Sequence, residues 1–191
     1  MKKTMQRKIK LAAAALCAGV SAASLAGGLA HARPPSVTAE HMLDRMQIEE
    51  MIINYYQELG GGGHHNLSEY FTKDAIFIVN GKRYQGRKAI DDIYAELGSE
   101  ASKLRQGKGH MLMTNLSVQF EDDNTATARV IWTGVMNDNL KVPPRVFEQG
   151  REYDTLVKVD GTWYFKQRNI VSDSAMANQY DDTYMKDRPE H

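Results

Sequence analysis

Two adjacent histidines, His64 and His65, follow a run of four glycines, Gly60 to Gly63. Histidine has the side-chain pKa nearest neutrality, so these imidazoles are candidate general acids or bases. A solvated loop with two surface histidines fits the same residues. A metal site does not, because adjacent side chains diverge and no His-x-His or His-x-x-x-His spacing is present. The glycine run also lacks the spaced fingerprint of a dinucleotide site, so we expect no metal and no cofactor.

The glycine run ends an amphipathic segment that begins at Asp44. Its apolar residues recur at helical spacing, at Ile48, Met51, Ile52, Tyr55 and Leu59. We predict a helix that Gly60 closes. Tyr55 lies on the buried stripe, where it is either plain core or a pocket wall that can orient or protonate a substrate.

Four long segments rich in β-branched and aromatic residues predict strands at 111–120, 125–136, 147–159 and 163–172. Turn residues between them favour antiparallel hairpins. Upstream of these strands we predict a short helix at 67–71, a strand at 74–79 that ends at Asn80-Gly81, and a helix at 87–97. Helices followed by strands indicate an α+β fold with helices on one face of a curved sheet.

Alternation along 147–159 assigns the side chains to two faces. Phe147, Gln149, Arg151, Tyr153, Thr155 and Val157 share one parity, and Glu152, Asp154 and Lys158 share the other. We expect the first set to face inward. On 125–136 we expect Arg129 to point outward and Trp132 inward.

An inward Arg151 needs a carboxylate of this chain or an oxygen of a ligand as its partner. In the second case Arg151 can hold a developing oxyanion. A structural salt bridge, for example to Glu148, is the alternative, and simple packing is the alternative for Trp132.

Residues 1–32 have the features of a cleaved signal peptide. Five basic residues lie within 1–10, a small apolar stretch covers 11–30, and Ala30-His31-Ala32 fits a cleavage site. Serines and glycines dilute the apolar stretch, so we expect no stable membrane anchor. We expect a periplasmic protein cleaved near Ala32, with one domain over 33–172. Residues 173–191 form a polar tail, either a loose end or an arm that faces a partner.

Removal of residues 1–32 takes five of the 24 basic residues and none of the 24 acidic ones, which leaves a formal charge of −5. This charge argues against nucleic acid or an anionic membrane as partner. Cys17, the single cysteine, is removed with the signal peptide. Thiol catalysis and disulfides are thereby excluded from the mature protein.

Taken together, the motifs resemble the SnoaL-like branch of the NTF2-like superfamily. They are the helix from Ile48 to Tyr55, Phe71-Thr72-Lys73-Asp74-Ala75, Gly86-Arg87-Lys88-Ala89-Ile90, Thr114-Asn115, Gly150-Arg151-Glu152-Tyr153-Asp154, Asp160-Gly161-Thr162-Trp163 and Arg168. The resemblance implies a cone-shaped α+β barrel, in which a curved antiparallel sheet and helices on one side enclose a pocket. It also implies a small hydrophobic or aromatic ligand and a homodimer or homotrimer.

In lyases of this superfamily, an aspartate after the first helix and a histidine on the first long strand often form the acid/base pair. By the family spacing, the aspartate positions hold Gly60 and Gly63 here, and the histidine position holds Met111, next to His110. The expected catalytic residues are therefore His64, His65, Tyr55 and Arg151. The expected substrate-binding residues are Trp132, Tyr153, His110 and Asn115.

The string from Glu148 to Asp154, with Trp132 and Ser172-Asp173-Ser174 around it, also resembles a smaller set of NTF2-like proteins. Some of these, the gamma-formaldehyde lyases, remove a hydroxymethyl group as formaldehyde from lignin-derived aromatic dimers. The expected function is a cofactor-independent lyase that removes water or formaldehyde from a small hydroxylated aromatic or polycyclic molecule. The alternative is a non-catalytic small-molecule-binding protein of the cell envelope.

Overall fold

The computed structural model describes residues 37–60, 66–104, 108–174 and 178–183 of the 191-residue chain. Contacts divide the chain into Met1–Pro35 and Ser36–His191, and every described residue belongs to the second unit. The expected signal peptide lies outside the described residues, and so do His64 and His65. Within the described ranges, no helix combines the length and apolar character needed to cross a bilayer.

The described residues of the second unit form two helices, six strands and two short 3₁₀ turns. In chain order they are α1 (Met42–Gly60), η1 (Leu67–Tyr70), β1 (Phe71–Val79), β2 (Lys82–Gln85), α2 (Gly86–Leu104), β3 (Lys108–Asp122), β4 (Thr125–Asn137), β5 (Arg145–Val159), β6 (Thr162–Ser172) and η2 (Asn178–Tyr180). The first helix and the four long strands lie where the sequence predicts them. The sequence reading missed the four-residue β2 and made α2 too short.

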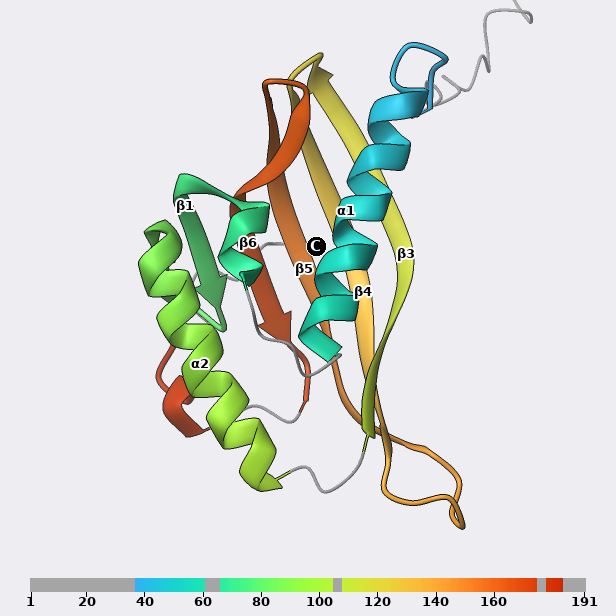
Figure 1. Ribbon diagram of the computed structural model, residues 1–191, viewed down its shortest axis with the longest axis vertical. Coiled ribbons are helices and arrows are strands. Elements are labelled where there is room, and N and C mark those ends of the chain that lie inside the picture. Colours follow the sequence, from blue (N-terminus) through green and yellow to red (C-terminus); the bar gives the residue numbers. More distant parts are fainter. Residues whose placement is uncertain (1–36, 61–65, 105–107, 175–177, 184–191) are drawn as a thin grey trace, which may run out of the picture. The chain divides into compact units, whose positions relative to one another are not determined.

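The six strands form one curved sheet in the order β2-β1-β6-β5-β4-β3 (Figure 1). The three hairpins among β3, β4, β5 and β6 are antiparallel, as predicted. β1 runs antiparallel to β2 but parallel to β6. The expected all-antiparallel sheet is therefore wrong for one pair, and the sheet is not a closed barrel because β2 and β3 remain edges. The α+β class and the cone-like arrangement are confirmed.

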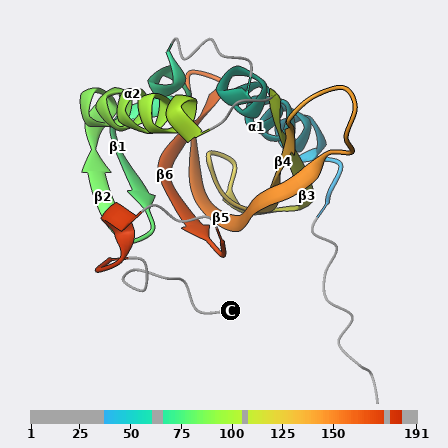
Figure 2. The same ribbon diagram turned by 90° about the horizontal axis from the view of Figure 1, so that it is seen from below.

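Both helices lie on the same side of the sheet, with α2 on the side of β1 and β2 and α1 toward β3 and β4 (Figure 2). Ile48, Ile52 and Tyr55 on α1 are fully buried, as their helical spacing predicts. α2 contributes Ile90 and Ile93 to the same core. The interior between α1 and the sheet is thus lined by one stripe of α1 and by the inner face of β3 to β6.

Two tight turns follow the predicted residue chemistry. Asn80 and Gly81 have φ of 46° and 83°, and Asp160 and Gly161 have φ of 51° and 80°. Consecutive positive φ values are those of the hairpin turn that Asn-Gly and Asp-Gly favour. These turns fix the registers of β1 with β2 and of β5 with β6.

A β-bulge interrupts β3 at Asn115, which has a φ of 56°. The register with β4 shifts between Thr114 and Ser117. Before the bulge, Met111 pairs with Gly134, whereas His110 pairs with Val135. Because the two faces alternate along a strand, Met111 shares the inner face with Gly134, and His110 is exposed on the other face.

The tail after Asp173 is not wholly loose. Tyr180 in η2 is 2% exposed and belongs to the hydrophobic core. The Lys82 ammonium lies 5.4 Å from the centre of its ring. Of the two alternatives for the tail, a loose end does not describe Tyr180, which packs against the core.

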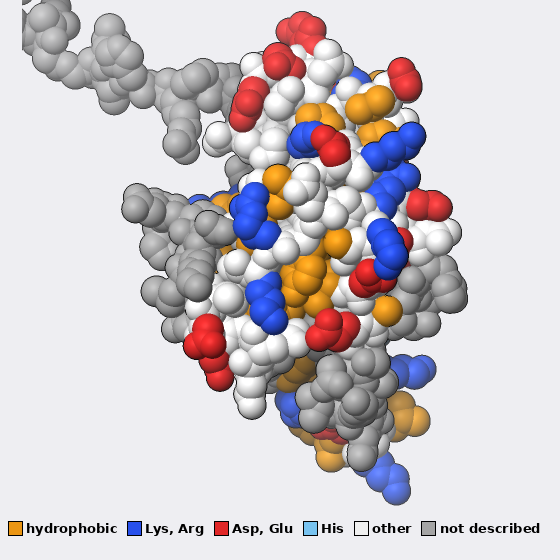
Figure 3. All heavy atoms as spheres, turned by 90° about the vertical axis from the view of Figure 1, so that its left-hand side faces the viewer, with side chains coloured by type: hydrophobic (Ala, Val, Ile, Leu, Met, Phe, Trp, Pro, Cys, Tyr) orange, Lys and Arg blue, Asp and Glu red, His pale blue; other side chains and the backbone are white. Residues whose placement is uncertain are grey.

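The side of the protein that lies to the left in Figure 1 carries basic and acidic side chains interspersed around a strip of apolar ones (Figure 3). Among the described residues seen on this face, basic and acidic side chains therefore lie close to one another.

Candidate active site

The inner face of β5 carries carboxylates, which reverses the predicted facing of this strand. Glu152 is 0% and Asp154 3% exposed, whereas Arg151 and Tyr153 are only half-buried. In the register with β4, Glu152 lies opposite Val130, which is fully buried. The prediction that Arg151 and Tyr153 face inward is therefore wrong, while the predicted inward facing of Trp132 is confirmed.

Arg168 on β6 explains why two carboxylates can lie inside. It is fully buried, forms an ion pair with Glu152 Oε2, and its Nε lies 4.0 Å from Asp154 Oδ1. Tyr56 on α1 donates a hydrogen bond to the same Glu152 oxygen. The Arg168 guanidinium also lies 3.9 Å from the centre of the Tyr55 ring. These five residues, Tyr55, Tyr56, Glu152, Asp154 and Arg168, are hereafter the buried ion cluster.

One proton balances the charge of the cluster. Burial raises the pKa of Asp154 well above its usual range, the nearby Glu152 carboxylate raises it further, and Arg168 opposes the change. Burial acts against the charge of Arg168, but Glu152, Tyr55 and Asp154 together raise its pKa. A raised pKa favours the protonated form of Asp154 beside the Arg168–Glu152 ion pair, an arrangement that carries no net charge.

The protonated form also agrees with the hydrogen bonding of Asp154. Neither of its carboxylate oxygens has a donor among the described residues. Its nearest titratable neighbours include Glu152, which accepts but cannot donate when ionised. A proton on Asp154 allows the two carboxyl groups to form a hydrogen bond, and it removes the repulsion between two buried negative charges.

Six polar atoms on the inner face have no hydrogen-bond partner among the described residues. Four are Asp154 Oδ1 and Oδ2 and Arg168 Nε and Nη1, and the other two are Glu152 Oε1 and the indole nitrogen of Trp132; all four side chains are at least nine-tenths buried. Glu152 Oε2 already accepts from Tyr56 and Arg168, so Oε1 is the oxygen that remains, and its two lone pairs allow it to accept both from a protonated Asp154 and from a bound molecule. Buried polar groups of folded proteins are nearly always paired, so such exceptions mark a candidate site.

Tyr55, a predicted catalytic residue, is fully buried next to the cluster. Its hydroxyl shares a hydrogen bond with the Tyr94 hydroxyl of α2. Burial is the main reason why the pKa of Tyr55 is raised, with Arg168 acting in the opposite sense. At neutral pH Tyr55 is therefore a neutral phenol that can donate a hydrogen bond but does not act as a base.

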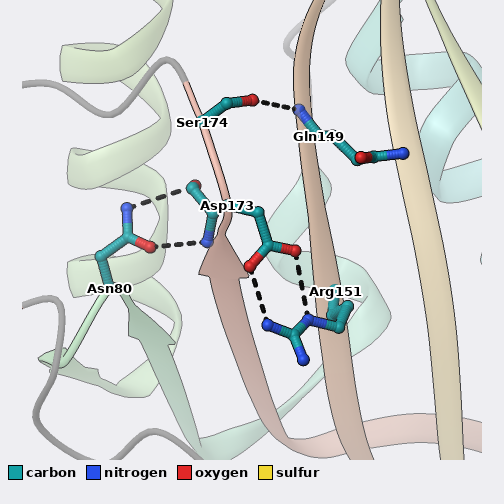
Figure 4. A network of polar contacts seen from close by, with 6 residues as sticks. Asn80, Gln149, Arg151, Asp173 and Ser174 are labelled. Carbon is teal, nitrogen blue, oxygen red and sulfur yellow. Dashed lines mark hydrogen bonds and ion pairs between the residues drawn. The ribbon is translucent and has the colours of Figure 1, made fainter.

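Arg151 holds the chain end of β6 in place. Its Nη2 lies 2.7 Å from Asp173 Oδ1, and its Nε donates to the other carboxylate oxygen at 3.2 Å (Figure 4). The Gln149 amide donates to Ser174 Oγ at 2.9 Å, and the Asp173 amide donates to the Gln149 carbonyl at 2.8 Å. The salt-bridge alternative for Arg151 thus describes these contacts, in which Asp173 is a partner.

The remaining predicted residues do not converge on the cluster. His110 and Asn115 are exposed on β3, and Tyr153 lies on the outer face beneath the Arg129 guanidinium, 5.3 Å from its ring centre. Trp132 is the one predicted substrate-binding residue on the inner face. His64 and His65 lie outside the described residues, so the structure does not test their role.

A surface groove of about 600 Å³ lies between α1, η1 and the start of β6. Glu50, Glu58 and Glu69 line it, together with Tyr70, whose hydroxyl donates to Glu58 Oε1 at 2.7 Å. Burial and this contact raise the pKa of Tyr70 to about 12. No residue of the buried ion cluster lines the groove. In the described part of the chain, no group of three or more His, Cys, Asp or Glu could hold a metal ion.

Sequence reasoning missed Glu152, Asp154 and Arg168 as site residues. The available signal was the pair of carboxylates two residues apart on one strand and an arginine on the next. Two such strands paired as a hairpin can place the three side chains on one face.

Comparisons with solved structures agree on the fold. A provisionally assigned scytalone dehydratase from Novosphingobium aromaticivorans is 22% identical, with a TM-score of 0.57, and the match covers 71% of this chain and 88% of that one. An NTF2-like protein with a cystatin-like fold from the same organism is 20% identical, with a TM-score of 0.58 and coverage of 71% and 85%. A protein of unknown function with a cystatin-like fold from Nostoc punctiforme is 18% identical, with a TM-score of 0.59 and coverage of 74% and 98%.

A search of curated proteins found no significant match. The SnoaL-like domain family matches residues 40–169, which is more than half of the chain and includes every member of the buried ion cluster. With this match and the shared fold, the chain belongs to the SnoaL-like branch of the NTF2-like superfamily.

Proposed function

We propose that this protein is a cofactor-independent lyase in which Glu152 is the general base. The proposed substrate is a small hydroxylated aromatic or polycyclic molecule that loses water or formaldehyde. The observation that carries the proposal is the unpartnered Oε1 of a fully buried Glu152, whose other oxygen is held by Tyr56 and Arg168. Likeness to dehydratase-type proteins in fold supports the same coarse class of reaction.

In the proposed step, Glu152 Oε1 takes the proton of a substrate hydroxyl. For formaldehyde loss, the O–H electrons form the C=O bond of formaldehyde while the adjacent C–C bond breaks. That electron pair forms a C=C bond as a neighbouring hydroxyl leaves, and Glu152 returns its proton to that oxygen to give water. For simple dehydration the base takes a C–H proton instead. Either way the carboxyl acts first as base and then as acid, so protons balance over the turnover.

The other cluster residues position this carboxylate. Tyr56 and Arg168 both bind Oε2, which leaves Oε1 toward a substrate. Protonated Asp154 keeps the cluster neutral, so an uncharged ligand meets no net buried charge. Preorganised donors of this kind need no rearrangement when charge develops on the substrate.

His64 and His65 remain proposed alternatives as the base, on the strength of the sequence alone. Replacement of both by alanine separates the two assignments. If Glu152 is the base, the double variant keeps most of its turnover. If an imidazole is the base, the double variant loses it.

A non-catalytic ligand carrier is the second candidate, and Met111 favours it. By the family resemblance the lyase histidine belongs at this position, and Met111 does lie on the inner face, opposite Gly134. A thioether cannot transfer a proton. A protein that had lost its chemistry would keep the pocket side chains and bind the ligand unchanged.

One experiment separates the two candidates. Purified protein is incubated with a panel of aromatic diols and polycyclic alcohols, and mass spectrometry detects loss of water or formaldehyde. Turnover that Glu152→Gln abolishes and Glu121→Gln on the exposed end of β3 leaves intact supports the lyase. Ligand binding without any product, in protein that is folded, supports the carrier.

We also propose export to the periplasm, from the signal-peptide features of residues 1–32, and an oligomer of two or three copies, from the family resemblance. Arg33 as the N-terminal residue of protein isolated from the periplasm would support the first. Light scattering of the purified mature chain tests the second.

A further inference from the structure

The groove between α1, η1 and the start of β6 is separate from the buried ion cluster, since the two share no residue. Its volume of about 600 Å³ is typical of a pocket for a small molecule. α1 contributes one stripe of side chains, whose spacing puts them all on the same face of the helix. They are Gln47, Glu50, Met51, Asn54 and Glu58. We refer to this feature as the acidic groove.

Three glutamates give the acidic groove a negative charge. Glu50 and Glu58 come from α1 and Glu69 from η1, and the described lining residues include no lysine or arginine. Burial, the hydrogen bond from its hydroxyl to Glu58, and the charges of Glu58 and Glu69 raise the pKa of Tyr70 to about 12. Tyr70 is thus a neutral phenol that balances none of this charge. A positively charged molecule would therefore be stabilised in the groove.

The three carboxylates do not converge on one point. In the described part of the chain, no three acidic, histidine or cysteine side chains lie close enough together to hold a metal ion. Glu50 and Glu58 lie about 12 Å apart along the axis of α1, at 1.5 Å per residue. A molecule with several positive charges along its length thus matches the groove better than a single small cation.

The remaining walls suit a flexible carbon chain between such charges. Tyr70, Trp163 and Tyr164 contribute aromatic rings, and Met51 contributes a thioether. The faces of aromatic rings attract ammonium groups. Methylene groups pack well against rings and against the adaptable methionine side chain.

Lys158 shows how an ammonium group is held beside one of these rings. Its Nζ lies 5.3 Å from the centre of the Trp163 ring and forms an ion pair with Asp44. Because Asp44 balances the charge of Lys158, this lysine does not neutralise the glutamates of the groove. The groove therefore offers the same combination of ring and carboxylate to a bound molecule.

We propose that the acidic groove binds a linear aliphatic polyamine, a chain of methylene groups with ammonium groups along it. The ammonium groups pair with Glu50, Glu58 and Glu69, and the methylene groups lie against Met51 and the aromatic rings. Such amines are protonated at neutral pH, as the lysine side chain is. The inference is independent of the proposed lyase reaction, because no residue of the buried ion cluster takes part.

Three molecules of equal chain length test the inference by calorimetric titration of the purified protein. Spermidine carries three ammonium groups, 1,8-diaminooctane carries only the two at its ends, and 1,8-octanediol carries none. The buffer contains about 0.15 M salt, which screens charges more than about 8 Å apart. We expect spermidine to bind and the diol to show no binding. The diamine should bind about two- to fivefold more weakly than spermidine, the range for one partly exposed ion pair.

The two tryptophans locate the binding site. Trp163 lines the groove and Trp132 does not. In protein labelled with ¹⁵N at its tryptophans, spermidine should move the indole N–H resonance of Trp163 and leave that of Trp132 in place.

Variants of α1 supply the matched control. Glu50→Gln and Glu58→Gln should each weaken spermidine binding by about two- to fivefold. Glu49→Gln removes the same charge from the neighbouring residue, which is exposed but does not line the groove, and should leave the affinity unchanged. Thermal melts check that the variants are folded, and the titrations of the unaltered protein stand independently of them.

Equal affinity for spermidine and 1,8-octanediol would overturn the inference. So would a spermidine affinity that Glu49→Gln and Glu50→Gln lower alike, or a spermidine titration that moves Trp132 instead of Trp163. Binding of a lysine tetrapeptide without binding of spermidine would assign the groove to a protein partner and also overturn the inference. None of these outcomes affects the lyase proposal, which depends on Glu152.

Discussion

Replacement of Asp154 by Asn tests the protonation state of the buried ion cluster. Asn has nearly the shape of a protonated carboxyl and can donate to Glu152 in the same way. Because burial and Glu152 raise the pKa of Asp154 in the folded protein, the folded state holds a proton that the unfolded state releases above about pH 3.9. The stabilising proton is fully present below that pH, and its contribution is lost as the pH rises toward the folded pKa.

The magnitude follows from the proton count. While the folded state holds one proton more than the unfolded state, the free energy of unfolding falls by about 1.4 kcal/mol per pH unit. Between pH 5 and pH 7 the wild-type protein should therefore lose up to about 2.7 kcal/mol relative to Asp154→Asn, provided Asp154 stays protonated over that range. Near pH 7 the variant should be as stable as the wild type or more stable.

Urea unfolding at several pH values, followed by tryptophan fluorescence, measures this difference. Asp74→Asn is the control, because Asp74 is exposed and its contact with Lys166 lowers its pKa. The stabilisation from the Asp74 carboxylate is present above the unfolded pKa and is lost as the pH falls. The difference in the free energy of unfolding between wild type and Asp74→Asn should therefore change with pH in the opposite direction. A constant loss of stability in Asp154→Asn at every pH would refute the reasoning and show that Asp154 is ionised.

Two further predictions concern packing and the chain end. Gly150→Ala should destabilise the protein by about 1–3 kcal/mol, because the new Cβ collides with the Trp132 ring. Gly109→Ala is the control, because its Cβ would meet its nearest neighbour at 3.6 Å, and it should lower the free energy of unfolding only slightly. Urea unfolding measures both variants, and equal losses of stability would contradict the close contact at Gly150. Arg151→Met should cost about 1 kcal/mol or less, since its ion pair with Asp173 is partly exposed. In Arg151→Met, hydrogen exchange should quicken at the Asp173 amide while turnover persists. If the folded variant instead loses turnover, the result would support the catalytic role of Arg151 that the sequence suggested.

Local patterns predicted most of the fold. The spacing of Ile48, Ile52 and Tyr55 indicates α1, and Asn80-Gly81 and Asp160-Gly161 mark two hairpin turns that the structure contains. Such features depend on neighbours within a few residues, so a sequence displays them directly. β2 was missed because it is only four residues long and half of its residues are exposed.

The facing of β5 could not be predicted by the same means. Alternation shows which residues share a face, but not which face is buried. Hydrophobicity favoured the face with Tyr153 and Val157, because Glu152 and Asp154 look like solvent-exposed residues. What reverses the choice is Arg168 on another strand, and a pattern within one strand contains no information about that partner. The same limit applies to Tyr180, which is buried by contacts far away in the sequence.

Kinetics of Glu152→Gln on a substrate found in the panel test the central claim most directly. Gln keeps the shape of the side chain, and Asp154 can ionise to balance Arg168, so the fold should survive. We predict that turnover falls by about 10²–10⁴-fold, the usual contribution of a general base, while ligand binding measured by tryptophan fluorescence and the turnover of Glu121→Gln stay near wild type. Turnover in Glu152→Gln that stays close to wild type would contradict the account. So would a loss of turnover of this size in the His64→Ala, His65→Ala double variant when Glu152→Gln remains active.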